Sequence, residues 1–462
     1  MYSASHSGRG IKKSCRAFND GKERAVFKMK IGLVSPYDWS YPGGVKSHIE
    51  RLAQEMRARG HTVRILTAIS GPANQEVEYG LYKFGWVAPL HINGSVARVS
   101  VSPDLRGALR RILLQERFDV VHVHEPFAST LSFAAVRIVN EYKTASVATF
   151  HASTTQKASG ARMAYAMASP FLQKTFHKID SLIAVSEAAR EHIAAHFDGD
   201  FHIIPNGLSL RWYEENAHPL EKYRGDAPVI LFLARLEPRK GLRYLLQAIP
   251  LIIQSARIHN RPIPRIVIVG DGSQLQQYQR YVEKNGWDNV EFTGYIEEQL
   301  KPAYYASAAI YCAPNTGNES QGYTLLEAMA SGAAVVASDI PGYHSVITGE
   351  EYGLLTPPKD HERLAWAIND LLDHPEKRAK IIANGKERVK AFDWNIIATT
   401  IENVYHESIE HKKEQIALRK LLIEQKKEEN KIEPKFLISP AIIPLTQTTG
   451  WNISAFDENV VE

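Results

Sequence analysis

Cysteine is scarce in this sequence, and its scarcity excludes two kinds of structure. The 462 residues include two cysteines, Cys15 and Cys312. Two cysteines are too few for a disulfide framework or for a cysteine metal cluster. Such sparing use of cysteine fits a reducing compartment, so we expect a cytoplasmic protein. The length is enough for two to three domains that each bury a hydrophobic core.

Long apolar runs are also missing. No run of about 18 or more apolar residues occurs, so we expect no membrane-spanning helix. The first 30 residues carry eight Lys/Arg against two Asp/Glu and lack the apolar segment of a secretory signal. They are compatible with an organellar transit peptide or with a basic tail that touches anionic lipid. We interpret residues 1–29 as a disordered or artefactual basic extension. A net charge of +4 is no evidence for a nucleic-acid partner.

Short β-branched runs alternate with helical stretches from Lys30 onward, a pattern that indicates parallel βαβ units and an α/β fold. The pattern restarts after a break at residues 204–218, which divides the chain into halves at 30–208 and 209–393. Ligands of open parallel sheets bind beyond the carboxyl ends of the strands, so we expect a cleft between the halves. The predicted strands are residues 30–36, 61–68, 119–126, 146–153, 181–186, 201–207, 228–236, 265–272, 290–296, 309–315 and 334–339.

The character of the chain changes after residue 411. Residues 412–435 carry eight Lys/Arg and five Asp/Glu around several Leu and Ile residues. This composition predicts a charged, solvent-facing helix, with a surface-binding amphipathic helix as the alternative. The last 27 residues are expected to form a flexible tail.

Several short motifs follow predicted strands. Gly43 and Gly44 separate the first strand from the first helix, where glycines and a helix N-terminus favour a bound anion. Arg235 and Lys240 lie where cations could neutralise a diphosphate, and Gly270 lies where backbone could approach a nucleotide. A tight turn or a solvated basic loop explains each motif equally well. None is a Walker loop or G-x-G-x-x-G, so a nicotinamide cofactor is not expected.

Three histidines stand out among the strands. His151 ends a strand that has a buried pattern, and it could be structural or functional. His122 and His124 alternate like metal ligands, but no acidic or histidine partner follows at a useful spacing, so we expect no metal site. The Asp198–Asp200 pair formally matches a metal-diphosphate motif but has the sequence of a turn.

Two glutamates lie eight positions apart around a glycine turn. Glu319 falls in a loop, whereas Glu327 falls in an apolar run that predicts a buried helix. A buried carboxylate is costly unless hydrogen-bond donors satisfy it. The pattern therefore leaves open which hydrogen-bond donor satisfies the Glu327 carboxylate.

Five segments, in the order in which they occur, resemble the retaining glycosyltransferases of family 4: PGGV, RKG, IVGDG, APNTGNESQGYTLLEAMASGAAVVASD and GLL. The resemblance covers about residues 30–411 and implies the GT-B fold: two facing Rossmann-like doubly wound domains with an interdomain cleft, and a C-terminal helix at 394–411 that crosses back to the first domain. It makes residues 30–208 the acceptor-binding domain, 209–393 the nucleotide-sugar-binding domain and 412–462 a charged helix with a tail. Within the family, five further segments are similar to the phosphatidylinositol mannosyltransferases: SPYDWSYPGGVKSHI, NGSVARV, HEPF, TFHASTT and AVSEAAR.

The resemblance implies roles for the residues above. Glu319 would bond the hydroxyls of the donor sugar and Glu327 those of the ribose. Arg235 and Lys240 would bind the diphosphate, and His151 would contact the sugar and be needed for transfer. The further donor-binding residues that it implies are Gly43, Gly44, Gly270, Ile296, Lys301, Ser320, Gln321, Gly322, Tyr323, Thr324 and Leu325.

The implied reaction moves a hexose, mannose from GDP-mannose, to a hydroxyl of a phosphatidylinositol-like lipid with retention of configuration. The sequence shows no candidate carboxylate nucleophile, which favours a same-face mechanism over the glycosidase route. No cofactor is required, and magnesium is allowed. The alternatives are a soluble transferase that uses a UDP-sugar on a small-molecule or polysaccharide acceptor, and a catalytically silent protein.

The implied acceptor pocket contains Tyr37, Lys46, Asn93 and Arg98, and Arg98 could pair with a lipid phosphate. Lys46 replaces an expected glutamine, and Ala152 and Gln156 also depart from the pattern, which puts the inositol headgroup in doubt. The predicted helix at 103–118 places Arg106, Arg110 and Arg111 near one face, where they could contact an anionic membrane at the inner face of the plasma membrane. An ordinary packed helix with a solvated edge is the alternative.

Overall fold

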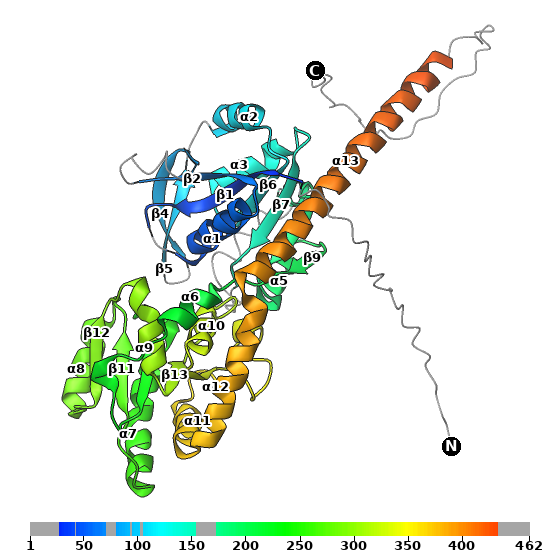
Figure 1. Ribbon diagram of the computed structural model, residues 1–462. Helices are drawn as coiled ribbons and strands as arrows, with labels where there is room; N and C mark the ends of the chain where they lie inside the picture. The colour runs from blue at the N-terminus through cyan, green and yellow to red at the C-terminus, as the bar shows by residue number, and fades with distance from the viewer. Residues whose placement is uncertain are drawn as a thin grey trace, which may run out of the picture. The chain divides into compact units, whose positions relative to one another are not determined.

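The computed structural model describes residues 27–41, 43–70, 80–92, 95–101, 105–153 and 172–432 (Figure 1). The chain divides into two compact units, Met1–Lys413 and Glu414–Glu462. The first unit contains two separate sheets, one mostly and one wholly parallel, with helices on their faces. This arrangement is the α/β architecture that the sequence pattern predicts.

A nine-stranded sheet forms the N-terminal half of the first unit. Its parallel path runs β3-β2-β1-β6-β7-β8-β9, and the β4–β5 hairpin joins β1 through the antiparallel strand β5. Every residue of β6 is buried, as expected of a strand that is covered on both faces. The strands are β1 Lys30–Asp38, β2 Thr62–Ala68, β3 Leu81–Lys83, β4 Trp86–Ile92, β5 Ser95–Val101, β6 Val120–His124, β7 Ala145–Phe150, β8 Ser181–Ala184 and β9 Phe201–Ile203.

Helices cover both faces of this sheet. One core joins α1 and the C-terminal helix α13 to residues of β1, β2 and β7. A second core on the other face joins α2 and α3 to β1 and β6. The helices that belong to this half are α1 Gly44–Ala58, α2 Leu105–Glu116, α3 Thr130–Val139 and α5 Glu187–Ala194.

A six-stranded parallel sheet in the order β12-β11-β10-β13-β14-β15 forms the second half. Its two faces carry two further cores, with α6, α9 and α10 on one face and α7, α8 and α11 on the other. The strands are β10 Val229–Leu233, β11 Arg265–Val269, β12 Val290–Gly294, β13 Ile310–Ala313, β14 Ala334–Ser338 and β15 Leu354–Thr356. The helices are α6 Leu210–Asn216, α7 Leu242–Ile258, α8 Leu275–Asn285, α9 Lys301–Ser307, α10 Tyr323–Ala330, α11 His361–Asp373 and α12 Pro375–Val389.

The chain crosses between the two halves twice. The segment after β9 leads into α6, and the segment after α12 leads into α13, Trp394–Ile432. Leu208 of the first crossing pairs with Asp393 of the second. Trp394, Ile401 and Tyr405 of α13 then pack in the core of the first sheet. The C-terminal helix therefore returns to the N-terminal half, as the resemblance implies.

The second unit contains the continuation of α13 from Glu414 to Ile432. Leu418, Leu421, Leu422 and Ile423 are exposed there. In this unit α13 thus continues with exposed apolar side chains, whereas Lys412, just before it, is buried.

The strands β3, β4, β5 and β15 were missed by the sequence analysis. β4 and β5 form an antiparallel hairpin, which breaks the βαβ rhythm used to find the others. The Asn93-Gly94 dipeptide between them is a common hairpin signal and could have revealed the pair.

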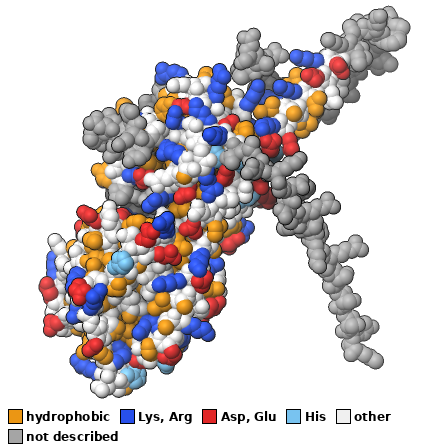
Figure 2. Space-filling view, viewed as in Figure 1, with side chains coloured by type: hydrophobic (Ala, Val, Ile, Leu, Met, Phe, Trp, Pro, Cys, Tyr) orange, Lys and Arg blue, Asp and Glu red, His pale blue; other side chains and the backbone are white. Residues whose placement is uncertain are grey.

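Within the part of the chain that the structure describes, no helix has the length and apolarity needed to cross a lipid bilayer. The visible face carries Lys/Arg and Asp/Glu side chains interspersed over both halves (Figure 2).

Candidate active site

Glu319 and Glu327 form an E-x7-E pattern that spans the loop between β13 and α10 and the start of α10, and the shape of this E-x7-E loop depends on Gly322. This residue precedes α10 with φ 81°, a left-handed backbone conformation. A Cβ atom at Gly322 would lie 2.5 Å from the Tyr343 ring, so a larger residue would clash. The glycine therefore sets the turn that presents Glu319 in the loop and Glu327 in the helix, as predicted.

Glu319 is held by cations. Its Oε1 accepts hydrogen bonds from Lys240 Nζ at 2.5 Å, Arg239 Nη1 at 2.7 Å and Asn315 Nδ2 at 2.9 Å. Burial raises the pKa of the Glu319 carboxyl, but Lys240 and Arg239 outweigh burial and bring the pKa below its ordinary value. The site therefore keeps an ionised carboxylate among donors that also suit a diphosphate.

The two predicted cations lie in different surroundings. Lys240 contacts Glu319 directly, whereas the side chain of Arg235 is 58% exposed and pairs with Glu237 at 3.0 Å. Arg239 contacts both Glu319 and Glu237, and sequence reasoning missed it. Its place beside Lys240 in the RKG motif was the signal that could have found it.

Gly270 follows β11 at the same edge of the second sheet. Its φ is 130°, and a Cβ there would lie 2.0 Å from the carbonyl oxygen of Ala234. The predicted glycine is thus required for close packing of two strand-end loops.

Glu327 is buried in α10 and is bonded by two tyrosines. Tyr213 Oη donates to Oε1 at 2.6 Å, and Tyr305 Oη donates to Oε2 at 2.8 Å. Lys301 Nζ lies 3.8 Å from Oε1. Protein hydroxyls thus occupy one acceptor position on each oxygen of the carboxylate that the sequence analysis assigned to ribose hydroxyls, and neither tyrosine was singled out there.

Lys301 links Glu327 to the preceding loop. Its Nζ contacts Glu298 Oε1 at 2.7 Å. Burial lowers the pKa of Lys301, but the charges of Glu327 and Glu298 outweigh it and raise the pKa above its ordinary value. Ile296, another predicted donor-binding residue, is partly buried against the core that includes α9 and α10.

The remaining predicted donor residues surround the α10 N-terminus and the α1 N-terminus. Ser320 accepts a hydrogen bond at its carbonyl oxygen from Ser186 Oγ, and Gln321 Oε1 accepts two from Asn206, at 2.7 Å from its backbone and 2.6 Å from its side chain. These bonds tie the E-x7-E loop to the N-terminal half. In α10, Leu325 is buried and Tyr323 and Thr324 are more accessible. A Cβ at Gly43 or Gly44 would have no neighbour within 4 Å, so the backbone at the start of α1 is open to approach.

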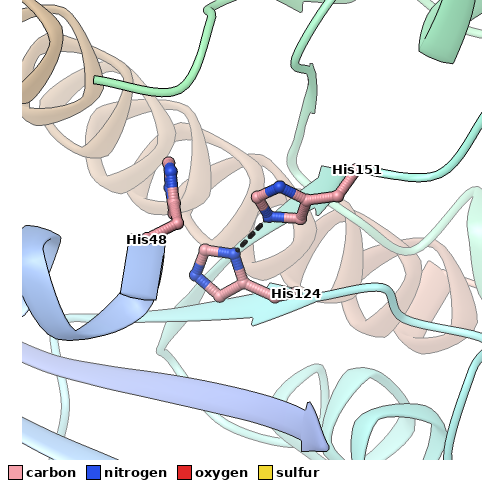
Figure 3. A group of neighbouring side chains, drawn as sticks. All are labelled: His48, His124 and His151. Atoms are coloured by element: carbon pink, nitrogen blue, oxygen red, sulfur yellow. Dashed lines mark hydrogen bonds between the residues drawn. The ribbon is translucent and has the colours of Figure 1, made fainter. Parts of the chain in front are cut away.

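Four buried histidines gather where the strands of the first sheet end, and Figure 3 shows three of them. His48 comes from α1, His124 ends β6 and His151 follows β7. His124 Nδ1 and His151 Nε2 are 3.0 Å apart and share one hydrogen bond. His122 Nδ1 contacts Tyr405 Oη at 2.7 Å, which joins the cluster to α13.

The histidines are neutral at pH 7. Burial lowers the pKa of His48 to about 4 and that of His122 to about 3. Burial also lowers the pKa of His124 and His151 well below the ordinary value, and repulsion between the imidazoles adds to it. His151 therefore carries a neutral imidazole, in which one nitrogen donates a hydrogen bond and the other accepts one.

Glu125 fixes the backbone beside His151, and sequence reasoning missed this role. Its Oε1 accepts from the backbone N–H of His151 at 2.5 Å and of Ala152 at 2.7 Å. The carboxylate thereby sets the turn at the end of β7.

Among the described residues, His48, His124 and His151 form the group whose spacing suits a metal ion. Each offers one ring nitrogen, and the three nitrogens lie within 4.8 Å of one another. Neutral imidazole is the form that binds zinc. The hydrogen bond between His124 and His151 already uses one nitrogen of each ring, so the group also works as a hydrogen-bonded network. The sequence analysis paired His124 with His122, whereas the structure also places it against His48 and His151.

The predicted acceptor residues lie around β1 and β5. Tyr37 pairs with Val99, next to Arg98. The Arg98 guanidinium lies 3.7 Å from the Tyr41 ring centroid, and Lys46 Nζ lies 5.4 Å from the Trp39 ring. Asn93 and Gln156 lie outside the described residues.

The predicted membrane residues lie on α2. Arg106 and Arg111 are exposed, and Arg110 forms a 2.8 Å ion pair with Glu141. Trp86 on β4 is 74% exposed.

Two family models match the chain. The model described as Glycosyltransferase Family 4 matches residues 42–212, and the one described as Glycosyl transferases group 1 matches residues 214–388. Together with the two parallel sheets, these matches define a glycosyltransferase of the GT-B fold.

Curated relatives cover most of the chain. A phosphatidyl-myo-inositol mannosyltransferase of Mycobacterium leprae (strain TN) is 37% identical over 380 residues, which is 82% of this chain and 96% of the relative. One of Mycolicibacterium smegmatis is 35% identical over 82% of this chain and 93% of the relative. The chain belongs to glycosyltransferase family 4.

Solved structures agree on the fold. Sucrose-phosphate synthase of Thermosynechococcus elongatus matches with a TM-score of 0.65 at 21% identity, covering 82% of this chain and 99% of the other. A glycosyltransferase of Rickettsia africae matches with a TM-score of 0.66 at 18% identity, covering 83% and 99%. At these identities the matches show the fold alone.

Proposed function

We propose that this protein is a retaining mannosyltransferase that moves mannose from GDP-mannose to a hydroxyl of a phosphatidylinositol-like lipid. The observation that carries the proposal is the similarity, over 82% of the chain, to relatives named phosphatidyl-myo-inositol mannosyltransferase. The cation-held Glu319 and the buried Glu327 support it, because they provide acceptors for sugar and ribose hydroxyls in one loop and helix.

In the proposed reaction, Glu319 binds the mannose hydroxyls while Lys240 and Arg235 bind the diphosphate. Arg239, which contacts the same oxygen of Glu319 as Lys240 does, adds a third cation. These cations stabilise the negative charge that develops on the leaving GDP. Backbone N–H groups from Gly322 to Leu325 lie at a helix N-terminus, where a phosphate is favoured.

Transfer proceeds on one face of the sugar. The bond between the anomeric carbon and the phosphate oxygen breaks, the acceptor oxygen bonds to that carbon, and the leaving phosphate takes the acceptor's proton. His151 contacts the sugar with a neutral imidazole whose orientation is set by His124. No metal cofactor is required and magnesium is allowed, so EDTA is expected to leave the rate unchanged.

Tyr37, Lys46, Asn93 and Arg98 form the proposed acceptor pocket, and Arg98 pairs with the lipid phosphate. Arg106, Arg110 and Arg111 hold the protein on anionic lipid at the inner face of the plasma membrane. The exposure of Arg106 and Arg111 supports this placement. Each cation near an anionic surface contributes about 1 kcal/mol.

A second candidate keeps the fold and changes the substrates. Lys46, Ala152 and Gln156 depart from the pattern of the lipid-specific group, which favours a soluble transferase that uses a UDP-sugar on a small-molecule or polysaccharide acceptor.

Calorimetric titration with GDP, UDP and ADP, on the wild type and Glu327→Ala, tests the donor. Selective GDP binding that is lost in the variant supports the mannosyl donor, and selective UDP binding supports the second candidate. Radiolabelled transfer from GDP-mannose to liposomes with and without phosphatidylinositol then tests the acceptor. Absence of binding by all three nucleotides would contradict both candidates.

A further inference from the structure

Glu327 is a charged residue inside an apolar core. The core around it includes Tyr213, Tyr305, Leu325 and Met329, and Glu327 itself is 2% exposed. Replacing a buried ionic group by a hydrophobic one of similar volume is often neutral or stabilising. Fold stability alone therefore gives no reason for a carboxylate at this position.

The two tyrosines lie on different helices, and each donates a hydrogen bond to one oxygen of the Glu327 carboxylate. Tyr213 of α6 bonds Oε1 and Tyr305 of α9 bonds Oε2, at 2.6 and 2.8 Å. An ionised carboxylate has about four acceptor positions, two on each oxygen. One hydroxyl donor on each oxygen fixes the plane of the group and leaves one further acceptor position on each.

Two vicinal hydroxyls match the acceptor positions that remain. A ribose presents its 2′ and 3′ hydroxyls in this way, and each can donate to one carboxylate oxygen. Lys301 Nζ, 3.8 Å from Oε1, balances the negative charge from one side.

We propose that Tyr213 and Tyr305 are positioning residues of the donor site, which hold the Glu327 carboxylate so that the site selects ribonucleotides by both ribose hydroxyls. This inference rests on the proposed nucleotide-sugar donor. Because Tyr213 lies on the helix that follows the first crossing between the halves, the ribose contact is also tied to that crossing.

The experiment measures calorimetric affinity of the full-length protein for GDP and for 2′,3′-dideoxy-GDP, with the two uridine analogues in parallel. The variants are Tyr305→Phe and Tyr213→Phe, which keep the ring and remove the hydroxyl. Tyr304→Phe is the matched control, because this neighbour on α9 has its ring against Tyr223 and Lys222. Thermal unfolding of each variant shows whether it is folded, and Tyr213→Phe decides if Tyr305→Phe does not fold.

We expect each variant to weaken binding of the ribonucleotide about tenfold, because a carboxylate that is no longer held in place loses about one hydrogen bond from a ribose hydroxyl, and to leave the dideoxy analogue unchanged. Tyr304→Phe should alter neither. Equal weakening of both nucleotides, or no change in either, overturns the positioning role while leaving the proposed function intact. A wild type that binds none of the four nucleotides overturns the proposed function and this inference with it.

Discussion

At the scale of single residues, the site is organised around carboxylates whose partners come from distant parts of the sequence. Glu319 shares one oxygen among Lys240, Arg239 and Asn315. Arg239 is 80 positions away in the chain. Such a shared acceptor holds the cations close together, and close cations suit a diphosphate better than either cation would alone.

Arg239→Ala should lower kcat/KM for the donor about 10- to 100-fold, since it removes one donor from the charge that stabilises the leaving group. Steady-state transfer assays check this value. Arg211→Ala is the control, because Arg211 is exposed and pairs with Glu215 of the same helix. A change of less than twofold in Arg239→Ala would show that Arg239 merely supports the loop.

The buried histidines predict a pH dependence of stability. The pKa of His48 is lowered to about 4 in the folded protein, from 6.5 when exposed. Between these values the unfolded chain binds more protons, so the free energy of unfolding should fall as the pH drops from 6.5 toward 4. The contribution of His48 is on the order of a few kcal/mol.

Urea unfolding at several pH values from 7 to about 4.5 measures this dependence. His48→Gln should flatten the curve relative to the wild type, whereas His218→Gln, at an exposed position, should leave its slope unchanged. An equally steep curve in His48→Gln would assign the acid sensitivity to other groups.

At the scale of elements, glycines fix how the loops at the strand ends fold. Gly322 combines a left-handed backbone with a close contact to Tyr343, whereas Gly286 ends α8 with a left-handed backbone in open space. Substitution of each of these two glycines therefore separates the cost of backbone strain from the cost of a steric clash.

Gly322→Ala should lower the free energy of unfolding by about 2–4 kcal/mol, since it adds a clash to the strained backbone. Gly286→Ala should cost about 1 kcal/mol from the backbone alone. Chemical denaturation compares the two, and equal losses would show that Tyr343 moves aside without cost.

At the scale of the whole molecule, the two halves are joined by specific bonds as well as by chain crossings. Asn206 and Gln321 exchange three hydrogen bonds, and α13 places Tyr405 against His122. The E-x7-E loop, the first crossing and the histidine cluster are therefore parts of one connected structure within Met1–Lys413.

Deleting residues 414–462 should leave nucleotide binding unchanged and shift Tm by less than about 2 °C, because side chains between Glu414 and Glu428 are mostly exposed and exposed segments add little to global stability. Thermal unfolding and calorimetry on the shortened protein check this expectation. Liposome flotation of the full-length and the shortened protein shows whether residues 414–462 add to membrane binding. A large fall in Tm would contradict the expected independence of the first unit.

The sequence by itself determined the α/β class, most strands of both sheets and the loop and helix positions of the two glutamates. These features follow from local periodicity and from glycine turns, which are readable over a few residues. The tertiary structure alone decided that Tyr213 and Tyr305 serve Glu327, that Arg239 joins Lys240 on Glu319, and that His48 lies beside His124 and His151. Partners such as Tyr213 and Glu327, 114 positions apart, meet only because two helices pack on one face of a sheet, and side-chain periodicity carries no information about that meeting.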